Sequence, residues 1–140
     1  MHRVLRPGGI AAVSVWRSPE NNPYISALAD GLSRHLSPEA EQSMLAPCGF
    51  GGRDEFFNLF TAARFASVTV EAVEIICDPI DAFDAIAGNL SGLPMAEDVA
   101  AMDPAKRTEM LDDMTNALSE YIADGILHQP MSAHVAIATA

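Results

Sequence analysis

Basic residues are scarce in this chain. Its 140 residues include eight Lys and Arg against nineteen Asp and Glu, which gives a net charge of −11. A surface this acidic repels phosphate backbones and anionic lipid headgroups, so we expect neither nucleic acid nor a membrane as a partner. The imbalance is local: residues 1–70 carry six acids and six bases, whereas residues 71–140 carry thirteen acids and only Lys106 and Arg107 as bases.

Cysteine and long apolar runs are also scarce. Cys48 and Cys77 lie in no metal-binding spacing, and the four histidines are scattered, so we expect no metal site. The two thiols are expected to be free in a reducing cytoplasm, although a disulfide between them remains an alternative. The chain has no secretory signal and no apolar run long enough to span a bilayer, which favours a cytoplasmic location.

The most informative stretch is RVLRPGGIAAVSVWR, residues 3–17. It predicts the end of a helix, a sharp turn at Pro7-Gly8-Gly9 and a strand over residues 10–16, because proline ends helices and glycine permits positive φ angles. The strand is almost wholly apolar, which is typical of a strand covered on both faces of its sheet.

The rest of the chain alternates helical and strand patterns. Alternating or continuous apolar residues predict two further strands, over residues 68–76 and 131–138. Apolar stripes and capping residues predict helices over about residues 23–36, 39–45, 54–63, 78–92 and 103–125. A length of 140 residues suits a single domain over residues 1–140 of the α/β class.

Residues 3–9, together with the order of the predicted elements after them, resemble the C-terminal half of a class I S-adenosylmethionine-dependent methyltransferase of the type 11-like group. In that family a helix ending R-V-L-x-P-G-G leads into the fifth strand, and Arg3, Val4, Leu5 and Pro7-Gly8-Gly9 match these positions. A later helix ends A-A-G-F in the family, and here Arg64 replaces that glycine. If the position requires a positive φ, Arg64 costs about 1 kcal/mol.

The resemblance implies a partial Rossmann-like fold. It implies a three-stranded mixed sheet in the order first-third-second, with surrounding helices and a lid-like helical insertion over residues 78–126. It also implies that the chain begins about two-thirds of the way through the family's pattern. No G-x-G-x-G turn follows a predicted strand, and the GFGG stretch at residues 49–52 is predicted to be a plain turn.

We therefore expect a methyltransferase-like protein that lacks the S-adenosylmethionine-binding half and is inactive alone. No catalytic or cofactor-binding residue is predicted in the isolated chain, and S-adenosylmethionine is expected only if a missing N-terminal half completes the fold. Two alternatives remain open. The chain could be a module that binds a small apolar molecule or assembles with a partner, or it could be part of a complete methyltransferase acting on a small molecule.

Four residues are predicted to bind substrate: Trp16, Arg17, Tyr24 and Phe83. The first three follow a buried strand, and ligands in open α/β sheets lie beyond the carboxyl ends of strands. Phe83 is expected to line a lid pocket together with methionines of the helical insertion, because Met adapts to irregular apolar ligands. The alternative is that these side chains only fill cores and pack loops.

The strand over residues 10–16 also predicts a homodimer. It is expected to leave one edge open, and it carries no charge, proline or other feature that protects an edge from pairing with another chain. Twofold pairing of this edge with its own copy would give a continuous six-stranded sheet. The alternative is that the N-terminal residues or the loop over residues 46–52 cover the edge.

Overall fold

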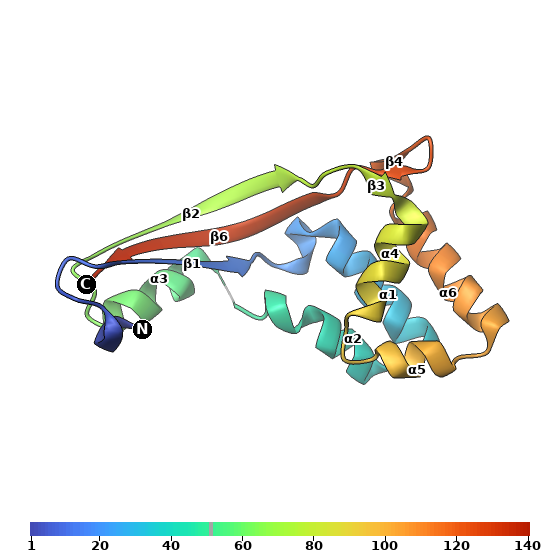
Figure 1. Ribbon diagram of the computed structural model, residues 1–140, viewed down its shortest axis with the longest axis horizontal. Coiled ribbons are helices and arrows are strands. Elements are labelled where there is room, and N and C mark those ends of the chain that lie inside the picture. The colour runs from blue at the N-terminus through green and yellow to red at the C-terminus, as the bar shows by residue number, and fades with distance from the viewer. Residues whose placement is uncertain (51) are drawn as a thin grey trace.

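A computed structural model describes residues 1–50 and 52–140 of the chain. They contain six α-helices and six strands, which confirms the α/β class (Figure 1). The helices are α1 (Pro23–His35), α2 (Pro38–Leu45), α3 (Arg53–Ala62), α4 (Ala82–Ser91), α5 (Ala96–Ala101) and α6 (Pro104–Ala117). The strands are β1 (Ile10–Trp16), β2 (Ser67–Ile76), β3 (Ile80–Asp81), β4 (Ile122–Ala123), β5 (Ile126–Leu127) and β6 (Pro130–Thr139).

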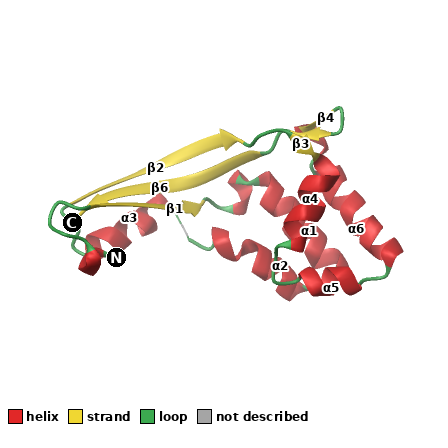
Figure 2. Ribbon diagram, in the orientation of Figure 1, coloured by secondary structure: helices red, strands yellow, loops and turns green. Residues whose placement is uncertain are grey.

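The main sheet has the order β1-β6-β2, so the predicted positions and order of the three long strands are confirmed. The prediction of a mixed sheet is wrong, because β6 pairs antiparallel with both of its neighbours. β1 and β2 do run parallel to each other, but β6 lies between them, so no backbone hydrogen bonds join β1 to β2. The sheet extends to one side of the molecule, and most helices gather at its other end (Figure 2).

The two faces of this sheet differ in cover. Helix α3 packs on one face, where Phe56, Phe60 and Phe65 form edge-to-face aromatic pairs over small residues of the strands. The opposite face, here the uncovered face, exposes large apolar side chains: Ile10, Trp16, Val73, Ile75 and Ile137. The prediction that residues 10–16 are covered on both faces is therefore wrong for the described chain, because α3 covers only one.

Helix α3 ends as the sequence indicated. Arg64 adopts a positive φ of 65°, a conformation that favours glycine. The amide of Arg64 donates to the Thr61 carbonyl and that of Phe65 to the Phe60 carbonyl. The second bond and the contact between the two phenylalanine rings are those of a Schellman motif, which turns the chain from α3 into β2.

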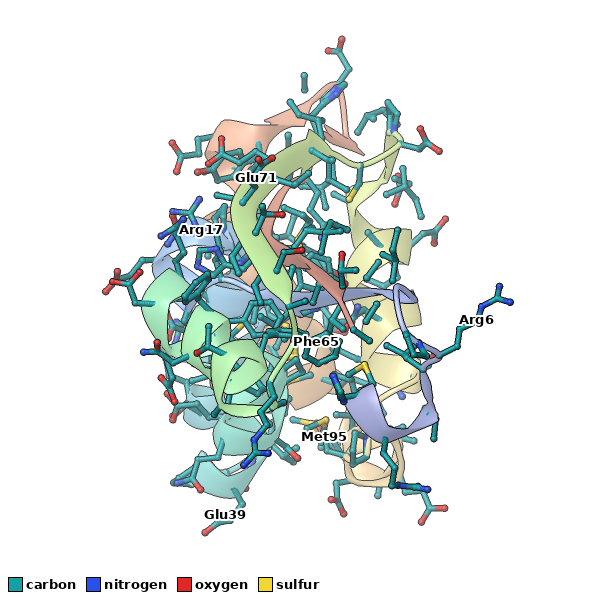
Figure 3. The ribbon with its side chains drawn as sticks, turned by 90° about the vertical axis from the view of Figure 1, so that its left-hand side faces the viewer. Arg6, Arg17, Glu39, Phe65, Glu71 and Met95 are labelled. Atoms are coloured by element: carbon teal, nitrogen blue, oxygen red, sulfur yellow. The ribbon has the colours of Figure 1, made fainter. Side chains whose placement is uncertain are left out.

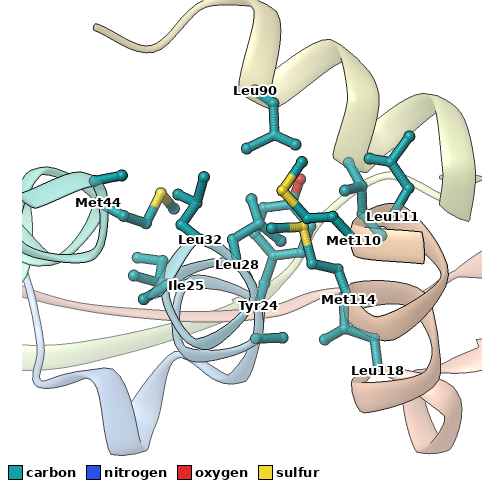
Figure 4. Close-up of a cluster of buried hydrophobic side chains, with 14 of the residues drawn as sticks. Tyr24, Ile25, Leu28, Leu32, Met44, Leu90, Met110, Leu111, Met114 and Leu118 are labelled. Atoms are coloured by element: carbon teal, nitrogen blue, oxygen red, sulfur yellow. The ribbon is translucent and has the colours of Figure 1, made fainter. Parts of the chain in front are cut away.

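The helices form a separate core. Leu28 and Leu32 of α1, with Met110 and Met114 of α6, are almost fully buried and meet Leu90 of α4 (Figure 4). Gly31 permits the close approach of α1 to α6, because a Cβ built on it would lie 2.5 Å from Cγ of Met114. Helices α1, α2, α4, α5 and α6 thus share a core, and strands β4, β5 and β6 border it through Ile122, Leu127 and Met131.

A second, small sheet in the order β3-β5-β4 was not predicted. Asp124 and Gly125, with φ angles of 52° and 79°, form the two-residue turn between β4 and β5. The predicted helix over residues 103–125 therefore ends early, at Ala117. The prediction that α4 begins at Asp78-Pro79 is also wrong, because the Asp81 carboxylate accepts from the Asp84 amide and caps the helix.

Residues 78–126 contain α4, α5, α6 and parts of the small sheet, and whether they act as a lid stays a prediction. Cys48 and Cys77 are both free thiols. Gly51, within the predicted GFGG turn, lies outside the described residues. Among the residues that are described, no helix is both long and apolar enough to cross a membrane.

Candidate functional site

The carboxyl end of β2 and the loop that follows β1 line a cavity of about 480 Å³, here called the strand-end cavity. Its walls come from the loop before α1, the end of β2, the start of β6 and the segment after α6. The lining residues are Glu20, Asn21, Pro23, Glu74, Ile75, Ile76, Tyr121, Pro130, Met131 and Ser132. Because parallel strands present their carboxyl ends at the same edge, this is where an α/β sheet places a ligand.

Arg17 lies behind one wall of the strand-end cavity and bonds to two residues of that wall. Its guanidinium donates to the Glu74 carboxylate at 3.0 Å and to the Ser132 hydroxyl at 2.9 Å. The arginine reaches toward β2 (Figure 3), and its side chain is mostly buried while that of Glu74 is mostly exposed. Arg17 itself does not line the cavity, so its contacts support a positioning role for two residues that do.

Asn22 fixes the loop that forms the opposite wall. Its amide nitrogen donates to the carbonyls of Arg17, Ser18 and Ser132, and its carbonyl oxygen accepts from the Ser132 amide at 2.8 Å. The residue is fully buried. Asn22 precedes α1 but its side chain makes no capping bond, because the amide joins the loop to β6 instead. Pro23 occupies the first turn of α1, where its missing N–H costs no hydrogen bond.

The chemistry of the strand-end cavity is acidic and apolar. Glu20 contributes a carboxylate, Glu74 contributes one that is already paired with Arg17, and Tyr121 contributes a phenol whose pKa is raised by partial burial and by the neighbouring Glu120. The phenol therefore stays protonated at neutral pH and can donate a hydrogen bond. Ile75, Ile76 and Met131 supply apolar surface, so the cavity suits an amine that carries an apolar body.

Trp16 lies at a different place, beside the open edge of β1. It lines a cavity of about 390 Å³, here called the edge cavity, with Ser14, Val15 and residues of the segment after α2, including Pro47 and Phe50. The segment after α2 therefore borders the carboxyl end of the edge. Trp16 and Arg17 are neighbours in the chain, yet Trp16 lines the edge cavity and Arg17 bonds to residues of the strand-end cavity.

Tyr24 is buried, and its hydroxyl donates to the Ala85 carbonyl at 2.9 Å, which joins α1 to α4. Burial raises its pKa well above the ordinary value of a tyrosine. A phenol that is buried and already bonded has no free position for a substrate. The predicted substrate role of Tyr24 therefore gains no support from its position, which is that of a packing residue.

Phe83 lines a third cavity, of about 310 Å³, formed by α4, α5 and α6 and here called the lid cavity. The methionines expected beside it, Met110, Met114 and Met95 (Figure 3), are instead buried in the helical core. The lid cavity is bounded by Ala87, Leu90, Ala96, Val99 and Leu111, and Arg107 is the one charged residue that the described part of the chain contributes to it.

The four predicted substrate residues are thus not brought together. Trp16 borders the edge cavity, Arg17 supports the strand-end cavity, Tyr24 is internal and Phe83 belongs to the lid cavity. Sequence reasoning missed Glu20, Glu74 and Tyr121, which meet only because three distant segments converge. Glu20 alone carried a signal, since it lies in the polar loop directly after a predicted strand.

Among the described residues, no group of three or more His, Cys, Asp or Glu side chains is placed to hold a metal ion. Comparison with known proteins gives no relative: no family model matches the chain, and no curated protein matches it.

Proposed function

We propose that this chain is a methyltransferase-like module that binds a small molecule in the strand-end cavity and transfers no methyl group on its own. The proposed ligand is an amine with an apolar body, which corresponds to the acceptor side of a methyl transfer. In such reactions catalysis is mostly the positioning of donor and acceptor, so a chain that holds only the acceptor is inactive.

One observation carries this proposal. The strands β1 and β2 run parallel to each other and flank the antiparallel β6, and the loop after β1 and the end of β2 both line the strand-end cavity. This order is the one that the resemblance to the C-terminal half of a class I methyltransferase implies. The location of the cavity also follows the general rule for ligands of open α/β sheets.

Titration calorimetry with S-adenosylmethionine tests the expected lack of the donor site. We expect no binding tighter than about 100 μM, which corresponds to roughly 5.5 kcal/mol. A lower dissociation constant, or methyl transfer to any amine by the purified chain, contradicts the proposal that the chain acts only on the acceptor side.

Binding of phenethylamine, followed by amide NMR, tests the acceptor side. We expect shifts at Ile75, Ile76 and Ser132, and weaker binding by the variant Glu20→Gln. Glu97→Gln is the matched control, because Glu97 is an exposed acid of α5 that does not line the strand-end cavity. Equal losses in the two variants would mean that the amine responds only to the overall negative charge.

A second candidate function is self-assembly through β1, favoured by the open edge of that strand. The amide of Arg17 bonds to the Ser132 carbonyl of β6, so odd-numbered residues of β1 bond inward and even-numbered ones point outward. In the described chain no hydrogen bond reaches the backbone of Ile10, Ala12, Ser14 or Trp16 along that edge. An apolar, uncharged edge of this kind is a template for another strand.

Twofold antiparallel pairing of β1 with a second copy uses the outward backbone groups of this edge, and it requires the segment after α2 to move away from Trp16. The register that uses every outward residue places Ile10 of one copy opposite Trp16 of the other, and Ala12 opposite Ser14. Their side chains then extend the uncovered face across both copies. The resulting homodimer has a six-stranded sheet in the order β2-β6-β1-β1-β6-β2.

Light scattering at micromolar concentration decides this second candidate. The chain mass is 14.9 kDa, and we expect about twice that value. Ala12→Lys should shift the dimer to monomer, because it adds charge to the paired edge, whereas Thr69→Lys on β2 should not. Val13→Lys is less suitable, because Val13 packs on the α3 side of the sheet. A monomeric wild-type chain, or a dimer unaffected by Ala12→Lys, contradicts pairing through β1.

A further inference from the structure

The lid cavity combines an apolar surface with one cation. Helices α4, α5 and α6 supply its apolar residues, and Phe83 at its border keeps 53% of its surface exposed. Filling the cavity with an apolar group would remove this ring and neighbouring methyl groups from water, which stabilises a complex in proportion to the area covered. The volume of about 310 Å³ lies at the small end of the range for ligand sites.

Arg107 gives the lid cavity its chemical preference. It projects from α6, and neither an ion pair nor a side-chain hydrogen bond joins its guanidinium to the described part of the chain. The other polar side chain of the lining, Ser91, already donates its hydroxyl proton to the Gly88 carbonyl at 2.7 Å. A free guanidinium binds a carboxylate through two parallel hydrogen bonds.

The position of this cation is unusual within its half of the chain. Residues 71–140 contain thirteen acids, and Lys106 and Arg107 are the only bases among them. Of these two, only Arg107 lines the lid cavity. The field of the surrounding acids opposes anions in general, so a carboxylate would be retained here only if its apolar part also entered the cavity.

We propose that the lid cavity is a second binding site, separate from the strand-end cavity, for a monocarboxylate with an apolar tail. The tail lies against Phe83, Leu90, Val99 and Leu111, and the carboxylate pairs with Arg107 at the rim. The site does not depend on the proposed acceptor binding, since the two cavities share no residue and favour ligands of opposite charge.

Decanoate, used below its micelle-forming concentration, is the probe, and decanol is its uncharged counterpart. We expect calorimetry to detect decanoate binding and amide NMR to place it at Ser91, Val99 and Ala100. Arg107→Gln should weaken decanoate binding at least about tenfold and change decanol binding less than about twofold, because only the carboxylate uses the guanidinium.

Lys106→Gln is the matched control, because it removes the same charge from the adjacent residue without altering the lining of the cavity. It should leave decanoate binding within about twofold of the wild-type value. Ala87→Leu, which fills the cavity with an apolar side chain, should abolish the binding of both probes. Circular dichroism and thermal unfolding of each variant establish that it is folded.

Three results would overturn the proposal. The first is no decanoate binding by the wild-type chain. The second is an equal loss in Arg107→Gln and Lys106→Gln, which would indicate a response to net charge alone. The third is binding that persists in folded Ala87→Leu or that shifts only residues of the strand-end cavity.

Discussion

The helical region and the sheet region of this molecule bury their apolar residues to different extents. In the helical region Leu28, Leu32, Met110 and Met114 are almost completely removed from water. In the main sheet one face is packed by α3, whereas the other exposes five large apolar side chains. The difference comes from how many elements surround each region, since five helices enclose the helical core and only α3 covers the sheet.

This difference indicates where the chain can interact. A region whose apolar side chains are already buried gains little from a partner, whereas exposed apolar surface is stabilised by any cover of matching shape. The uncovered face and the open edge of β1 are therefore the parts of the molecule that favour association. The helical region instead offers an open apolar cavity of about 310 Å³, which is of small-molecule size.

The largest expected effect comes from a matched pair of truncations, one in each region. Leu118→Ala should lower the free energy of unfolding by about 2–5 kcal/mol, because Leu118 is only 1% exposed and leaves a cavity. Ile137→Ala should lower it by less than about 1 kcal/mol, because 42% of Ile137 is already in water. Urea denaturation measures both, and equal losses would contradict the contrast between the two regions.

Two glycines sharpen the comparison within the helical region. Gly31→Ala should destabilise the chain by about 1–3 kcal/mol, since its methyl group would overlap the Met114 side chain between α1 and α6. Gly88→Ala should instead stabilise it by roughly 0.5–1 kcal/mol, because no atom lies within 4 Å of the added Cβ. Thermal unfolding checks both signs, and a stable Gly31→Ala would mean that α1 and α6 separate easily.

Arg64→Gly tests the connection between α3 and the sheet. We expect it to raise the free energy of unfolding by roughly 1 kcal/mol or less, because glycine adopts the observed positive φ without strain but loses more entropy on folding. Asp124→Gly is the control with the same backbone conformation, and its gain should be smaller, since Asp tolerates that region better. A loss of stability in Arg64→Gly would refute the strain.

The smallest expected effect is a pH dependence in the sheet region. Burial, with Arg17 and Arg53 nearby, lowers the pKa of His134 below its ordinary value of 6.5. The unfolded chain then binds a proton more readily than the folded one, so stability falls as the pH drops through 6.5 toward the lower folded value. His134→Gln should lose less stability than the wild type between pH 7 and pH 5 in urea titrations; identical profiles would count against this coupling.

The positions of the long strands could be predicted from the sequence, because apolar pattern and turn residues are local signals. The order of the strands, the antiparallel direction of β6 between β1 and β2, and the special conformation at Arg64 were implied instead by the family resemblance. The term mixed failed because no other strand pairs with β1 or β2 in the described chain, so that every ladder is antiparallel.

The hairpin of the small sheet has a clear turn signal in the sequence, but a competing helical pattern in the residues before it favoured a helix. Asp124-Gly125 is a strong hairpin turn, yet the apolar residues before it also fit the helical stripe of α6, which led to a helix that was too long. The candidate cavities were beyond prediction for another reason. Glu20, Glu74 and Tyr121 are far apart in the sequence, and only the packing of the sheet against the helical region brings them together.

The place of β6 in the chain has a consequence for how the molecule forms. This strand lies between β1 and β2 in the sheet, yet it follows both of them in the chain. The hydrogen bond between Arg17 and Ser132 closes a separation of 115 residues. Contacts this distant require a large loss of chain entropy before they contribute any stability, which slows folding. Helices α1, α2 and α4 to α6 can therefore pack before β6 has paired with β1 and β2. Until that pairing forms, both strands have unpaired edges that can bond to strands of other chains.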